Sequence, residues 1–133
     1  MQHKYDLAGH RINMAHECLT AAKNNLASKD YKASANRSYY CIFNAMRSIT
    51  ALDGRDFKSH KALITHFRAN YIKTGIFEKE LSTTLRDLLQ ARTASDYDDF
   101  YIIGKEDVIQ QIEKAEQFLN CIEKYVKQHT PTT

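Results

Sequence analysis

Three polar residues in the last third of the sequence are the first candidates for chemistry: Arg92, Asp96 and Tyr97. Arg92 follows Leu88 by four residues, so a helix here would place both side chains on one face. A guanidinium on an apolar face must be paired, or must face a cavity or an interface, because an isolated buried charge is costly. Two interpretations follow. In the first, Arg92 and Asp96, four residues apart on a helix, form a structural ion pair. In the second, Arg92 binds phosphate in a groove.

A second group combines Arg37 with Tyr39 and Tyr40. In one interpretation the tyrosines belong to the core and the arginine is partly buried beside them. In the other, Arg37 joins Arg92 around a single anion, for which the planar guanidinium is well suited.

His60 is the third candidate, within the segment Lys58-Ser59-His60-Lys61 at the expected start of a helix. One interpretation is a capped histidine with satisfied hydrogen bonds. The alternative is a general base or a phosphate ligand, since histidine exchanges protons near neutral pH.

Patterns typical of other chemistry are missing from the sequence. The six histidines form no HExxH pattern, and there is no Gly-rich phosphate loop and no GxSxG turn. The acids Asp96, Asp98 and Asp99 lack the glycine turn and the terminal glutamate of a calcium loop. We therefore expect no metal site and no cofactor.

Helical periodicity dominates the elements that must position these residues. With one proline and four glycines in 133 residues, the chain has too few turn residues for an all-β fold. Apolar stripes predict helices over residues 7–27, 30–53, from 59 towards 75, from 77 to about 92, and 105–128, with a helix end or loop at 95–104. Amphipathic helices with short connections predict an all-α fold, an antiparallel bundle of four to five helices. We expect one domain over residues 1–128 and a frayed tail at 129–133.

Charge is unevenly distributed along the chain. Residues 37–92 hold ten Lys/Arg and five Asp/Glu, whereas residues 93–133 hold four and eight. The middle of the chain could therefore meet a polyanion, although solvated faces of a bundle explain the pattern equally well. The three cysteines form no CxxC pair and suggest buried thiols in a reducing compartment. Without an apolar leader or a long apolar run, we expect a cytoplasmic protein with no membrane partner.

Several residues taken together, in order and spacing, resemble the HEPN family, particularly its small stand-alone prokaryotic members. The resemblance covers about two thirds of the chain and rests on Ala35-x-Arg37-x-Tyr39-Tyr40-x-x-Phe43-x-Ala45, Ser59-His60, Phe67, Tyr71-x-x-x-Gly75-x-Phe77, Arg92-x-x-x-Asp96-Tyr97, Ala115 and Phe118.

The resemblance implies a helical bundle, usually a homodimer, with a groove at the dimer interface around the fourth helix. Many members are metal-independent ribonucleases in which an arginine binds the phosphate and a histidine four to six residues later assists attack by the 2′-hydroxyl. Members often stand beside a nucleotidyltransferase as a toxin–antitoxin or defence pair, and in some pairs that enzyme adenylylates a tyrosine. Arg92 matches the family arginine, but Tyr97 and Asp98 stand where the histidine is expected.

Two functions remain open on this basis. In the first, the protein cleaves or binds RNA or a nucleotide through Arg92, Asp96, Tyr97 and His60, with Arg37 and Tyr40 contributing to binding. In the second, it is a non-catalytic partner of a nucleotidyltransferase, with Tyr97 as the contact or modification site. A third interpretation makes the Arg92 motif purely structural.

Overall fold

The computed structural model describes residues 2–57, 59–97 and 102–131, and for residues 91–97 it describes the backbone alone. The described chain contains helices and no strand, so the predicted all-α bundle is confirmed. In chain order, the elements are α1 (Gln2–Ala27), α2 (Tyr31–Leu52), α3 (His60–Phe67), the π-helix η1 (Arg68–Ile72), α4 (Glu80–Tyr97) and α5 (Lys105–Gln128).

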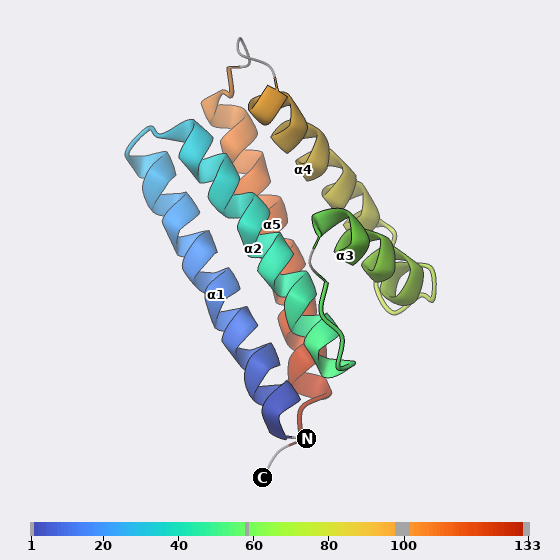
Figure 1. The fold of residues 1–133 in the computed structure, drawn as a ribbon. Coiled ribbons are helices and arrows are strands. Elements are labelled where there is room, and N and C mark those ends of the chain that lie inside the picture. Colours follow the sequence, from blue (N-terminus) through green and yellow to red (C-terminus); the bar gives the residue numbers. More distant parts are fainter. Residues whose placement is uncertain (1, 58, 98–101, 132–133) are drawn as a thin grey trace.

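Three long helices form the main layer of the molecule, and two shorter segments cover one side of it. In Figure 1, α1, α2 and α5 run side by side, while α3 and α4 lie on the far side of α2 from α1. α2 therefore touches each of the other four α-helices and stands at the centre of the fold. None of the helices in the described ranges has the length and apolarity needed to cross a bilayer.

Small residues allow α1 and α2 to pack closely. Ser34 Oγ donates a hydrogen bond to the carbonyl oxygen of Ala22 over 2.7 Å, and Ser48 Oγ donates to that of Ala8 over 3.0 Å. These bonds lie towards opposite ends of the contact and satisfy buried hydroxyls. Six fully buried small residues repeat at seven-residue intervals along the two helices: Ala8, Ala15, Ala22, Ser34, Cys41 and Ser48.

Such a tight contact should tolerate no added volume. We expect Ala15→Leu to lower the free energy of unfolding by about 1–3 kcal/mol, because three extra carbons must displace α2. Ala27→Leu is the matched control, since Ala27 is an exposed residue of the same helix. Urea unfolding of the two variants and the wild type measures the effect. Equal stabilities for the two variants would contradict the close packing of α1 on α2.

Aromatic rings join α3 and η1 to α5. Phe67 is fully buried, and its ring centroid lies 5.4 Å from that of Tyr71, 5.8 Å from Phe77 and 5.7 Å from Phe118. The apolar stripe along α5 also lies in the core. It consists of Val108, Ile112, Ala115, Leu119, Ile122 and Val126. This packing fixes the segment that follows His60 against the three-helix layer.

Helix ends follow the expected signals in α2 and α3. Asp30 is the N-cap of α2, and its side chain accepts a hydrogen bond from the backbone amide of Ala33. Gly54 and Gly75 have φ values of 71° and 84°, the left-handed conformation that ends a helix. These residues therefore set where α2 ends and where the segment after η1 turns towards α4.

Three expectations differ from the structure. α1 begins at Gln2 rather than at residue 7, and Gln2 Nε2 donates to Asp6 Oδ1 one turn later over 3.1 Å. α4 begins at Glu80 rather than near residue 77, and it ends at Tyr97, inside the segment 95–104 where a helix end or loop is expected. Cys121 is exposed, because it lies off the apolar stripe of α5. Cys41 is buried as expected, and burial raises the pKa of its thiol to about 12.

Candidate functional site

His60 stands at the first position of α3, next to the side of α2 that faces away from α1 and α5. The hydroxyl oxygen of Ser59 accepts a hydrogen bond from the amide of Ala62 over 3.0 Å. Ser59 is therefore the N-cap of α3, and it fixes the backbone from which the half-buried His60 side chain projects.

A hydrogen bond joins His60 to α2. Tyr39 Oη lies 2.5 Å from His60 Nδ1, and Tyr39 is only 7% exposed. Because Nδ1 is engaged, proton exchange between His60 and a ligand would involve Nε2. In the form of the imidazole that accepts a proton at Nε2, Nδ1–H donates to the tyrosine oxygen. Whichever nitrogen carries the proton, the contact with Tyr39 orients the imidazole ring.

Aromatic side chains of α2 hold the imidazole from several directions. The ring centroid of His60 lies 4.0 Å from Phe43, 5.4 Å from Tyr39 and 6.0 Å from Tyr40. We call these four residues, Tyr39, Tyr40, Phe43 and His60, the aromatic cluster. It brings together predicted site residues from two separate parts of the sequence, Tyr40 and His60.

Arg37 adds a positive charge at the edge of the aromatic cluster. Its guanidinium carbon lies 5.5 Å from the centroid of the Tyr40 ring, and its Nη2 donates to Asn36 Oδ1 over 2.9 Å. Within the described residues Arg37 forms no ion pair, so no carboxylate neutralises it there. Arg37 therefore lies beside Tyr40, as one of the two tyrosines with which the sequence groups it.

Arg92, Asp96 and Tyr97 all belong to α4, with Tyr97 as its last residue. Their side chains lie outside the described residues. The backbone places Arg92 and Asp96 one turn apart on a continuous helix. Leu88, one turn before Arg92, is 4% exposed, so the face that leads to Arg92 is turned towards the core as expected. α4 contacts α2, the helix that carries Tyr39 and Arg37.

A second charged group, which the sequence did not reveal, anchors the loop before His60. Asp56 Oδ1 accepts from Arg47 Nη2 over 3.0 Å and from the amide of Phe57 over 2.9 Å, and lies 3.6 Å from Arg11 Nη2. Burial opposes ionisation of Asp56, but these hydrogen bonds and the two arginine charges together lower its pKa. For Arg11, burial and then the charge of Arg47 lower the pKa.

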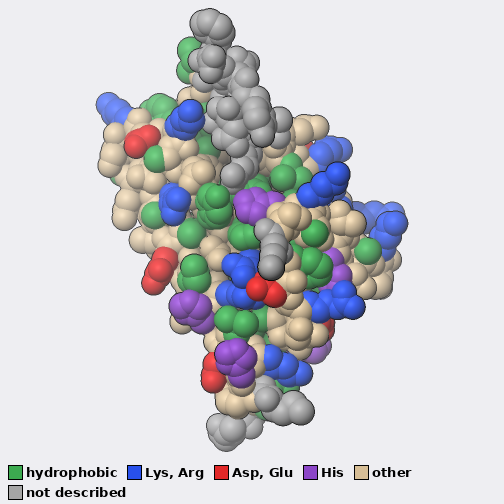
Figure 2. Space-filling view, in the orientation of Figure 1, with side chains coloured by type: hydrophobic (Ala, Val, Ile, Leu, Met, Phe, Trp, Pro, Cys, Tyr) green, Lys and Arg blue, Asp and Glu red, His purple; other side chains and the backbone are tan. Residues whose placement is uncertain are grey.

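This Arg11–Asp56–Arg47 group connects to the aromatic cluster through Arg47. The guanidinium carbon of Arg47 lies 5.8 Å from the centroid of Phe43, which in turn packs on His60. No short motif could have signalled the group, since its members come from α1, α2 and the following loop. Figure 2 shows basic side chains interspersed with hydrophobic ones over the middle of this face.

No set of three or more His, Cys, Asp or Glu side chains in the described part of the chain is placed to hold a metal ion. The groups that the described residues present at this face are an oriented imidazole, tyrosine hydroxyls and guanidinium groups. Together these groups can bind a phosphate and move a proton.

Comparison with known proteins relates the chain to a family. The family model for the HEPN domain matches residues 8–125. A protein of Thermotoga maritima named "UPF0332 protein" is 32% identical over 113 residues, covering 85% of this chain and 86% of its own length. Two proteins of Methanocaldococcus jannaschii, each named "Putative toxin", are 28% and 26% identical; they cover 86% and 88% of this chain, and 78% and 87% of their own lengths. The chain therefore belongs to the HEPN family.

Proposed function

We propose that this HEPN protein is a toxin-like ribonuclease that cleaves RNA without a metal ion. The observation that carries the proposal is the hydrogen bond between Tyr39 and His60 inside the aromatic cluster. It supplies an oriented imidazole in a protein whose α4 carries the family arginine, Arg92, without the histidine that usually follows. The names of the two archaeal relatives support the toxin-like role.

In the proposed reaction His60 Nε2 accepts the proton of the 2′-hydroxyl of RNA. The 2′-oxygen then bonds to the adjacent phosphorus, and the bond from phosphorus to the 5′-oxygen breaks. That oxygen leaves as a hydroxyl after taking a proton from water or from Tyr97. Arg92 stabilises the charge on the phosphoryl oxygens during the exchange, and Arg37 draws the polyanion to the site. Asp96 orients Arg92 from the next turn of α4.

Cleavage in EDTA tests this proposal. We expect the purified protein to cleave RNA with 2′,3′-cyclic phosphate ends, and Arg92→Ala to slow cleavage by about 10²-fold or more. Arg86→Ala is the matched control, because Arg86 is an exposed arginine of the same helix. A folded wild-type protein that leaves all RNA intact, or one that EDTA inactivates, would contradict the proposal.

A second candidate is a non-catalytic partner of a nucleotidyltransferase, modified at Tyr97. It is favoured by the sequence after Arg92, where tyrosine and aspartate stand in place of the histidine. Incubation with a nucleotidyltransferase encoded nearby and nucleoside triphosphates would then add a nucleotide to the wild type and not to Tyr97→Phe, as read by mass spectrometry.

A homodimer is part of both proposals, since the family resemblance places the groove at an interface between two copies. Light scattering coupled to size exclusion would report twice the chain mass of 15.4 kDa. A protein that is monomeric at micromolar concentration would contradict the proposed homodimer.

A further inference from the structure

We propose that Tyr40 and Arg37 bind an unpaired nucleobase of the RNA, stacked between the tyrosine ring and the guanidinium group. This inference rests on the proposed ribonuclease function and deepens it. The proposed reaction involves only the sugar and the phosphate of the RNA. Tyr40 and Arg37 would also contact the base, and this contact distinguishes an unpaired base from one held in a duplex.

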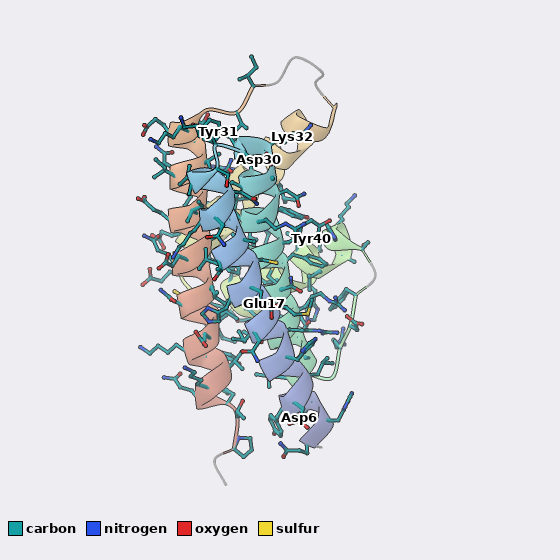
Figure 3. All side chains as sticks on the ribbon, turned by 90° about the vertical axis from the view of Figure 1, so that its left-hand side faces the viewer. Asp6, Glu17, Asp30, Tyr31, Lys32 and Tyr40 are labelled. Atoms are coloured by element: carbon teal, nitrogen blue, oxygen red, sulfur yellow. The ribbon has the colours of Figure 1, made fainter. Side chains whose placement is uncertain are left out.

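Tyr40 occupies the outward side of α2. Figure 3 shows its side chain leaving α2 on the side away from α5. Tyr40 is half-buried, and so are Arg37 and Arg47, which stand one and two turns from it along the same helix. Arg47 is paired with Asp56, whereas Arg37 lies over the Tyr40 ring. An aromatic ring beside an arginine is an arrangement by which proteins hold single strands, with bases on rings and phosphates on basic groups.

Three of its neighbours restrict the orientation of the Tyr40 ring. Tyr39, Phe43 and His60 approach it with interplanar angles of 87°, 87° and 85°, and with centroids 5.4, 6.2 and 6.0 Å away. Edge-to-face contacts of this kind are favourable and restrict ring rotation. A ring that is already ordered loses little entropy when a base stacks on it, which favours binding.

Arg37 is placed to close over a base on Tyr40. Its guanidinium carbon is 5.5 Å from the ring centroid, more than one van der Waals separation. A base between the two groups needs two such separations, about 7 Å in all. Arg37 must therefore move outward by only about 1.5 Å. Besides the ring, Arg37 contacts Asn36 through a hydrogen bond, and Asn36 is an exposed residue, so among the described residues little opposes the movement.

Because Tyr40 lies beside His60, a base bound at Tyr40 would lie close to the site of the proposed cleavage. Their ring centroids are 6.0 Å apart, so a base on Tyr40 and a phosphate reached by His60 belong to the same nucleotide or to neighbouring ones. In a duplex the bases are stacked and paired with each other, and bringing one out costs a few kcal/mol. Tyr40 and Arg37 would thus select loops and single strands over helices.

Binding of uncleavable oligonucleotides tests the inference separately from cleavage. The probes are a fluorescent 2′-O-methyl single strand, the same strand with one abasic position at each register in turn, and its duplex. The variants are Tyr40→Leu, which removes the ring, and Tyr40→Phe, which keeps it. Tyr5→Leu is the control, because Tyr5 also lies beside a cation, with Lys4 Nζ 5.1 Å from its centroid, but lines a groove between α1 and α5. Thermal melts establish that each variant is folded.

We expect the wild type, Tyr40→Phe and Tyr5→Leu to bind the intact strand about tenfold more tightly than the most weakened abasic strand or the duplex, the low end of the range for one stacked base. Tyr40→Leu should lose this preference. If the wild type binds the intact and all the abasic strands equally, or if folded Tyr40→Leu keeps the preference, base stacking is overturned while the ribonuclease proposal stands. If the wild type binds none of the probes and cleaves no RNA, both fail.

Discussion

Replacing His60 with glutamine should slow RNA cleavage by about 10²–10⁴-fold and leave the protein folded. Glutamine keeps a polar group near Tyr39 Oη but cannot take the proton of a 2′-hydroxyl near neutral pH. His60 is half-buried at the start of α3, where Ser59 provides the cap, so the backbone of the helix should survive the change. Initial cleavage rates in EDTA, with a thermal melt of each protein, measure the effect.

Two further variants separate chemistry from packing at His60. Tyr39→Phe keeps the ring that packs in the cluster but removes the hydroxyl that contacts Nδ1, so we expect a smaller loss, about tenfold, from a less well oriented imidazole. His16→Gln should cleave at the wild-type rate, because His16 is an exposed histidine of α1 that pairs with Glu123. A folded His60→Gln protein with the wild-type rate would exclude His60 from the reaction.

Truncating Phe67 should have the largest effect on stability. We expect Phe67→Ala to lower the free energy of unfolding by about 3–5 kcal/mol, because the ring is fully buried and its removal leaves a cavity. The ring packs on Phe77 and Phe118 and so joins α3 to α5. The midpoint of urea unfolding should fall while the slope stays unchanged.

Phe57 provides the comparison for this prediction. It is half-buried in the loop before α3 and packs on His66 at 4.7 Å between ring centroids. Phe57→Ala should cost less than half as much as Phe67→Ala, since less apolar area is lost from the interior. Similar losses for the two variants would mean that Phe67 does not hold α3 on the bundle.

Much of the fold could be predicted from local sequence because each helix carries its own signals. Asp30 and Gly54 bracket α2, and the stripe from Val108 to Val126 predicts α5 over the residues where it occurs. The limits of α1 and α4 were less predictable. The starts of both helices differ from the expected residues, and helix propensity alone discriminates only weakly between helix and loop at a helix end.

The candidate site depends on contacts between distant parts of the chain, so the sequence indicated its members better than their arrangement. His60 and Tyr39 are 21 residues apart, and only the packing of α3 on α2 brings them within hydrogen-bond distance. Arg11 and Asp56 are more widely separated and belong to no motif. By contrast, Arg37 and Tyr40 lie one turn apart on α2, so helical spacing alone predicted that they would meet.

The central claim of the proposed function is that a histidine at the start of α3 and an arginine on α4 act on the same phosphate. A double-mutant comparison of Arg92→Ala, His60→Gln and the combined variant, by rate of RNA cleavage in EDTA, tests it most directly. If both side chains act on one phosphate, the combined variant should be about as slow as the slower single variant, because residues that act as a unit are not additive. If Arg92→Ala abolishes cleavage while His60→Gln, folded and at equal concentration, cleaves at the wild-type rate, His60 does not replace the missing histidine.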